Sequence, residues 1–172
     1  MKLFLYLASL MLVANSCGNT KSTLNTVEDT ISNTPISTEK IIVETKKNTI
    51  YSLVEDTAGS LYPAFETGNA TTLIFNYTEK GAAGTADGDY TETVHLMIPN
   101  DSNYLKLKDQ NLQQLKMVFG KFCFCRGEAG YYKVTNGSVS IKNEKGLMTI
   151  KASFEIPETS NKISTIEQVV IL

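Results

Sequence analysis

Strict alternation of apolar and polar residues is the feature that most constrains the fold of this chain. The clearest case is the segment 147–156, LMTIKASFEI, in which the apolar side chains from Met148 to Ile156 share one parity and polar side chains such as Lys151 occupy the other. Successive side chains of a strand point to opposite faces. This period of two therefore predicts an antiparallel strand with one face in a core and the other in water.

Turn residues place two hairpins next to this segment. Residues 137–143 alternate in the same way, and the stretch Asn143–Gly146 that follows them predicts a hairpin with the first segment. The dipeptide Asn136-Gly137 is a strong signal for a two-residue turn. It predicts a second hairpin, between residues 131–135 and 137–143.

Further short segments along the chain have strand character. They are residues 40–45, 49–55, 71–78, 90–98, 117–125 and 163–172. The segments 71–78 and 90–98 flank a loop rich in glycine and alanine, which predicts a hairpin with a long tip. Only residues 109–116 resemble a helix, with Asp109 as the expected N-cap.

Many short strands separated by turns predict an all-β domain over residues 40–172. The expected architecture is an antiparallel β-sandwich or barrel with at most one short helix. Apolar residues make up 42% of the chain, which is enough to form a hydrophobic core. The sequence does not distinguish the sandwich from the barrel.

The first residues have the organisation of an export signal. Lys2 precedes an apolar run, Leu3–Ala14, that is too short to cross a bilayer as a helix. Small residues lead from this run directly to Cys17, and this arrangement resembles the lipobox of bacterial lipoproteins. The resemblance implies that residues 1–16 are a signal peptide removed by cleavage. It also implies that Cys17 carries a diacylglycerol on its sulfur and an acyl chain such as palmitate on its amine.

The resemblance also implies a destination. Gly18 stands where many lipoproteins retained at the inner membrane have aspartate, so we expect an outer-membrane lipoprotein that faces the periplasm or the cell surface. Its lipid makes the membrane a partner. Residues 17–39 are rich in serine, threonine and asparagine and contain Pro35, a composition typical of a flexible tether.

Composition and motifs exclude several functions. The net charge of -2 excludes an electrostatic nucleic-acid binder, and one histidine excludes a centre built on several imidazoles. The sequence contains no G-x-S-x-G turn or comparable nucleophile setting. It therefore favours a non-catalytic binding module for a protein or a glycan, which includes an inhibitor or immunity role, over an enzyme.

Cys123 and Cys125 are the main candidates for chemistry. With Cys17 lipidated they are the two remaining cysteine thiols of a chain in an oxidising compartment. Three alternatives stay open: structural thiols or a local disulfide, a site for Cu or Zn, and thiol redox exchange. A disulfide requires the chain to leave the regular strand conformation, because side chains two residues apart lie roughly 6.6 Å from each other there.

Other polar residues are weaker candidates. His95 is a further candidate ligand for a metal or redox site at the two cysteines. Its place in the alternation of residues 90–98, however, predicts that it faces solvent. Asp87 and Asp89, together with Glu92, offer oxygens to Ca²⁺ from the glycine-rich loop, but their spacing does not match an EF-hand. Arg126 and Glu128 are expected to form a local ion pair and are the candidate interface residues, because arginine is common in binding hot spots.

Overall fold

Short strands make up most of the part of the chain that the computed structural model describes, which is residues 41–85 and 88–172. The strands are β1 Ile42–Lys46, β2 Thr49–Glu55, β3 Leu61–Thr67, β4 Ala70–Glu79, β5 Tyr90–Pro99, β6 Tyr104–Lys108, β7 Val118–Phe122, β8 Gly130–Lys133, β9 Asn136–Glu144, β10 Leu147–Glu155 and β11 Thr165–Ile171. One 3-10 helix, η2, spans Asp109–Leu115. The expected signal peptide 1–16, the tether 17–39 and Cys17 lie outside the described residues.

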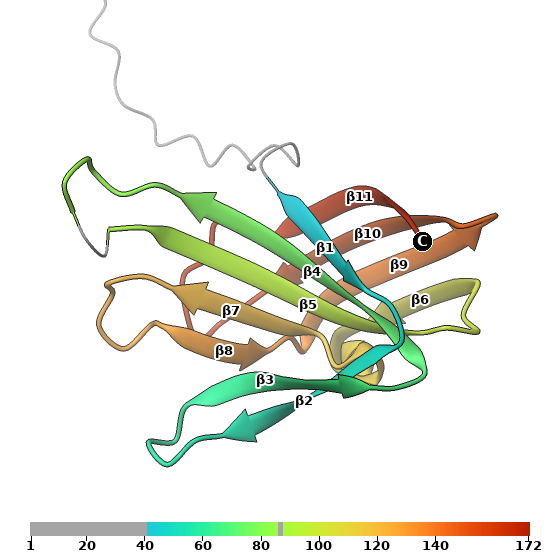
Figure 1. The fold of residues 1–172 in the computed structure, drawn as a ribbon, viewed down its shortest axis with the longest axis horizontal. Coiled ribbons are helices and arrows are strands. Elements are labelled where there is room, and N and C mark those ends of the chain that lie inside the picture. The colour runs from blue at the N-terminus through green and yellow to red at the C-terminus, as the bar shows by residue number, and fades with distance from the viewer. Residues whose placement is uncertain (1–40, 86–87) are drawn as a thin grey trace, which may run out of the picture. The chain divides into compact units, whose positions relative to one another are not determined.

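Two antiparallel sheets face each other, as Figure 1 shows. One has five strands in the order β1-β4-β5-β7-β8, and the other has four in the order β11-β10-β9-β6. The all-β prediction is confirmed, and of its two architectures the structure has the sandwich. The predicted hairpins 71–78 with 90–98 and 137–143 with 147–156 are also confirmed, as the pairs β4–β5 and β9–β10.

The core lies between the two sheets. It is formed by those alternate side chains of each strand that the sequence pattern predicts to be buried. Phe75, Leu96 and Phe119 enter it from the five-stranded sheet, and Ile150 and Phe154 enter it from β10. The Phe119 and Phe154 rings lie 6.4 Å apart across the layers. Each such side chain stabilises the fold by about 1.5–3 kcal/mol through the burial of apolar surface.

The β2–β3 hairpin adds a third layer on the outer face of the five-stranded sheet. Tyr51 of β2 is buried there, and its hydroxyl donates to the backbone oxygen of Lys116. The sequence does not predict β3, because Pro63 lies within the strand. Proline donates no backbone hydrogen bond and so weakens a strand prediction. Here Pro63 pairs with Leu53 in a two-stranded ladder with open edges.

The predicted hairpin at Asn136-Gly137 is wrong. β8 pairs with β7 in one sheet, whereas β9 pairs with β6 and β10 in the other, so the dipeptide lies where the chain crosses between the layers. Gly137 has φ +134, and a Cβ there would lie 2.2 Å from the backbone oxygen of Ser153. The glycine is required by this crossing and by close contact with β10, not by a two-residue turn.

The 3-10 helix differs from the expected helix in its first residue. Lys108 precedes it with no capping side chain, so the prediction that Asp109 is the N-cap is wrong. The Asp109 carboxylate instead accepts a hydrogen bond from the backbone N–H of Gly137 at 3.0 Å. It thereby ties the helix to the crossing between the sheets. Within residues 41–85 and 88–172, no helix is long and apolar enough to span a membrane.

Candidate functional site

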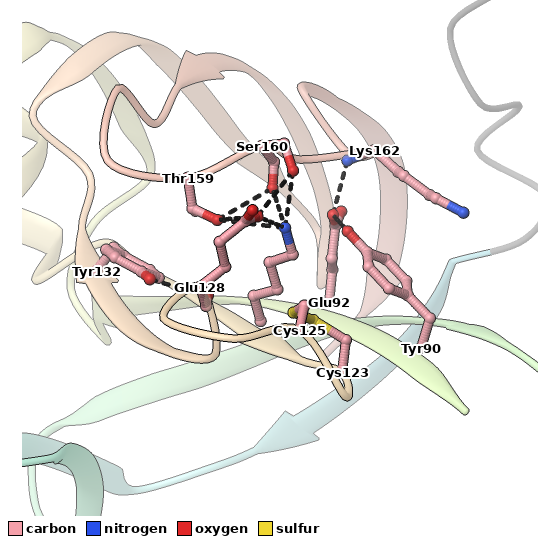
Figure 2. Close-up of polar contacts among 10 residues, drawn as sticks. Tyr90, Glu92, Cys123, Cys125, Glu128, Tyr132, Thr159, Ser160 and Lys162 are labelled. Atoms are coloured by element: carbon pink, nitrogen blue, oxygen red, sulfur yellow. Dashed lines mark hydrogen bonds and ion pairs between the residues drawn. A yellow bond between two sulfur atoms is a disulfide. The ribbon is translucent and has the colours of Figure 1, made fainter. Parts of the chain in front are cut away.

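Both candidate cysteines lie in a turn at one end of the sandwich (Figure 2). We call residues 123–129, which connect β7 to β8, the cysteine turn. The loop between β10 and β11, residues 156–164, lies next to it and supplies several of its polar contacts. The two segments together form the candidate site.

A disulfide joins Cys123 to Cys125. β7 ends at Phe122 and the chain bends at the next residue, which brings the two Cα atoms to 5.2 Å. That separation lies within the usual range for a disulfide and is shorter than the spacing of roughly 6.6 Å in a regular strand. Of the alternatives left open by the sequence, the structure shows the local disulfide.

The disulfide closes a loop that contains only Phe124. By chain entropy, closing three residues stabilises a fold by roughly 1.5 kcal/mol, whereas a loop of about 100 residues gives about 4.7 kcal/mol. The bond therefore contributes little to the stability of the whole sandwich. Its main effect is to fix the path of the cysteine turn.

Lys121 anchors the cysteine turn from inside the sandwich. The residue is 2% exposed, and its Nζ donates to the carboxylate of Glu128. It also donates to the Oγ and the backbone oxygen of Ser160, at 2.8 and 2.9 Å, and to Thr159 Oγ1 at 3.3 Å. All of these partners are oxygen acceptors, which is the arrangement that a lysine ammonium needs. Hydrogen bonds from Lys121, Ser160 and Thr159 hold the pKa of Glu128 below its usual value.

Glu92 fixes the loop 156–164 to the same sheet. It is 0% exposed and lies directly opposite Lys121 in the β5–β7 ladder. Its carboxylate accepts hydrogen bonds from the backbone N–H groups of Lys162 and Ile163, both at 2.7 Å, and from the hydroxyl of Tyr90. Burial, and then the hydrogen bond to Glu92, raise the pKa of Tyr90.

The sequence does not single out Lys121, and it suggests Glu92 only as an added oxygen ligand for Ca²⁺ beside Asp87 and Asp89. A usable signal was present, because both are charged residues in the inward parity of strongly apolar strands. A charge in such a position is buried and needs a partner. The partners come from loops distant in the sequence, so the pattern alone does not identify them.

The outer surface of the cysteine turn is apolar and basic. Phe124 is 97% exposed, and Phe122 is 39% exposed with its ring 5.2 Å from that of Tyr131. Arg126 is exposed and makes no ion pair with any residue in 41–85 or 88–172. The expected pair between Arg126 and Glu128 is wrong, because Glu128 turns inward to the buried Lys121.

His95 is buried, which corrects the prediction that it faces solvent. It is 3% exposed because the β2–β3 hairpin covers its face of the sheet. The rings of Tyr51, Phe65 and Tyr131 surround it at 5.7, 6.1 and 5.7 Å. Its Nδ1 has no hydrogen-bond partner among the described residues, and burial lowers its pKa to about 4.

The structure does not assemble the proposed metal ligands. His95 pairs with Val118 at the start of β7, whereas Cys123 follows the end of that strand. Asp89 accepts hydrogen bonds from Lys80 Nζ and the backbone N–H of Gly81, at 2.7 and 3.0 Å, and Asp87 lies outside the described residues. Within the described ranges, no three residues among His, Cys, Asp and Glu form a metal-binding group.

No family model, curated protein or solved structure significantly matches this chain.

The buried Glu92 generates a prediction about stability. In Glu92→Gln one carboxylate oxygen becomes an amide nitrogen, so one of the two backbone N–H groups that it binds loses its acceptor. Leaving a buried donor unsatisfied costs about 1–3 kcal/mol. We expect urea unfolding to show a loss of at least about 1 kcal/mol, whereas Glu155→Gln on the exposed face of β10 changes little. Equal effects of the two substitutions would show that Glu92 does not hold the loop.

The buried His95 generates a prediction about pH. The pKa of His95 is about 4 when folded and 6.5 in its unperturbed state, so between these values the unfolded chain binds a proton that the folded chain excludes. The free energy of unfolding therefore falls as the pH drops from 6.5 to 4, by up to about 3 kcal/mol from this group, and is unaffected by it above that window.

The measurement is urea unfolding of the wild type and His95→Phe at pH 7, 5.5 and 4. The variant removes the titrating group and keeps an aromatic ring among Tyr51, Phe65 and Tyr131. We expect its stability to depend less on pH across this window. If the stabilities of the two proteins depended on pH in the same way, His95 would not be the group that destabilises the fold at low pH.

Proposed function

We propose that this chain is an exported lipoprotein whose β-sandwich acts as a non-catalytic binding module for another protein, with the cysteine turn as its contact surface. One observation carries the proposal: Phe124 is 97% exposed between the two cysteines of a turn that is held at both of its ends. A large aromatic side chain in this position contributes nothing to the core. Its apolar surface is available to a partner.

The contacts of the cysteine turn support a preorganised binding surface. The disulfide fixes the first half of the turn, and Glu128 fixes the second half through its carboxylate on Lys121. The backbone oxygen of Glu128 also accepts a hydrogen bond from the hydroxyl of Tyr132 at 2.8 Å. A surface that is already ordered loses less conformational entropy on binding, which increases affinity.

The side chains of the turn favour a protein over a glycan. Aromatic residues and arginine dominate the energetics of protein interfaces, and Phe122, Phe124 and Arg126 lie within five residues of sequence. The turn carries no amide side chain to bind sugar hydroxyl groups. The proposed partner has an apolar pocket for the Phe124 ring and a carboxylate for the Arg126 guanidinium. An inhibitor or immunity protein fits this description.

The disulfide also favours one alternative function over another. Soft-metal binding by Cys123 and Cys125 requires both sulfurs as thiolates, and the disulfide engages both of them. Thiol redox chemistry, in contrast, uses a disulfide as one of its two states. It is the second candidate function.

The lipid anchor rests on the sequence around Cys17 and is tested separately. We expect Cys17→Ala to abolish incorporation of radiolabelled palmitate and to move the protein from the membrane fraction to the soluble fraction of the envelope. Acyl chains give stable membrane attachment when two or more are present. The matched control is Ser16→Ala, which keeps a small residue before the cysteine. Palmitate labelling that survives Cys17→Ala would refute the anchor.

The binding surface is tested with a photo-crosslinking amino acid, p-benzoylphenylalanine, placed at position 124 in the living cell. We expect a discrete crosslinked protein, and none when the same amino acid replaces Tyr104, which is 62% exposed on β6. Phe124→Ala should then weaken the affinity for the purified partner at least tenfold, or about 1.4 kcal/mol.

Arg126→Gln should weaken the same complex, whereas Tyr104→Ala should leave it unchanged. Identical crosslinks at both positions would mean that the contact is not specific to the cysteine turn. An unchanged affinity of Phe124→Ala would refute Phe124 as the anchor of the interface.

A further inference from the structure

We propose that the disulfide between Cys123 and Cys125 is redox-active and exchanges with cysteine pairs of polypeptides that contact the cysteine turn. This inference rests on the proposed function, because an exported chain is the one that meets such polypeptides in an oxidising compartment. It adds a chemical step to the binding surface, and the step can be measured on the protein without its partner.

The sandwich does not need this bond in order to fold. The cysteines are two residues apart, so the closed loop contains only Phe124. β7 and β8 are paired from Val118 with Lys133 to Lys121 with Gly130, independently of the sulfurs. A reduced protein therefore stays folded, unlike one whose disulfide connects distant parts of the chain.

The same contacts keep the reduced cysteines close together. Lys121 binds Glu128 and the loop 156–164, while the hydroxyl of Tyr132 binds the backbone oxygen of Glu128. None of these bonds involves a sulfur atom, so they can form whether the cysteines are oxidised or reduced. The two thiols remain positioned to close the ring again. A disulfide that opens and closes within a folded domain has the property that exchange requires.

The surroundings of the sulfurs favour attack by a thiolate. Both cysteines are partly exposed, and they lie in a turn between the ends of β7 and β8. Arg126 follows Cys125 directly and has no ion-pair partner among the described residues. A cation close to a thiolate stabilises it, and the position of Arg126 next to Cys125 in the sequence makes it the candidate for this role. We therefore assign Cys125 as the leaving sulfur and Cys123 as the sulfur that is attacked.

The step balances with a dithiol polypeptide as the reductant. One thiolate of the polypeptide attacks Cys123 Sγ, the bond between Cys123 and Cys125 breaks, and Cys125 leaves as a thiolate that takes up a proton. The second thiolate of the polypeptide then attacks the mixed disulfide and releases Cys123, which is protonated in turn. Two electrons move from the polypeptide to this chain, and the polypeptide gains a disulfide.

Phe124 identifies the class of polypeptide. It lies between the two reacting cysteines and is 97% exposed, so a chain that packs on its ring is held next to the sulfurs. Exposed apolar segments next to free cysteines are typical of exported proteins that have not finished folding. The proposed substrate is such a polypeptide in its reduced form.

The first measurement is the redox equilibrium of the purified full-length lipoprotein in detergent with graded ratios of reduced to oxidised glutathione. Thiols are counted by alkylation and mass spectrometry after acid quenching. We expect reversible reduction without denaturant, and a circular dichroism spectrum that stays that of the folded domain. Reduction only in denaturant, or unfolding on reduction, overturns the proposal.

The second measurement follows oxidation of a synthetic peptide that carries two cysteines next to an apolar segment. We expect one disulfide per molecule of oxidised protein, formed at least tenfold more slowly by Phe124→Ala and at the wild-type rate by Tyr104→Ala. Arg126→Gln should shift the equilibrium several-fold toward the disulfide of this protein, because its thiolate is less stabilised. No oxidation of the peptide above the rate with oxidised glutathione alone overturns the proposal.

The two proposals fail in different ways. A double variant, Cys123→Ser with Cys125→Ser, cannot exchange but keeps Phe124 and the anchor formed by Lys121 and Glu128. If this variant still forms the crosslink at position 124 and the wild-type disulfide is inactive in exchange, the binding proposal is supported and the redox proposal is refuted. Active exchange without a crosslinked partner would leave the redox step without the binding module.

Discussion

A carboxylate and an ammonium, buried opposite each other in the β5–β7 ladder, determine how the loops are arranged at the end of the sandwich that carries the cysteine turn. Glu92 and Lys121 face each other on β5 and β7, and both point inward where the two sheets end. An uncompensated charge in such a position costs several kcal/mol, so each must be met by polar groups from elsewhere in the chain. The loop 156–164 and Glu128 supply them. The position of the cysteine turn follows from this requirement.

The β2–β3 hairpin covers the aromatic residues on the outer face of the five-stranded sheet but does not cover Phe124 in the cysteine turn. Tyr51 and Phe65 of the β2–β3 hairpin close over His95, and Tyr131 completes the cluster. Phe122 contacts this layer through Tyr131, whereas Phe124 is 97% exposed. One group of aromatic rings is thus buried beneath the hairpin, while the ring of Phe124 stays in contact with solvent.

The alternation of apolar and polar residues predicted the strands and hairpins whose formation depends on residues close together in the sequence. Alternation identified β10 and its partner β9, because one buried face imposes a period of two. The pattern failed where a distant segment changes the environment. His95 lies in a polar parity that the β2–β3 hairpin covers, and Gly137 serves a crossing between sheets. The disulfide was among the alternatives, but the exposure of Phe124 depends on how the turn leaves β7.

The order of the strands has a further consequence at β11, which is an edge strand of the four-stranded sheet. β11 pairs with β10 alone among the described strands and forms one edge of that sheet. It contains no proline and a single charge, Glu167, while Val169 and Ile171 are exposed. Natural proteins usually protect such edges with charges, prolines or bulges. This strand therefore has the composition of a template for the growth of an intermolecular sheet.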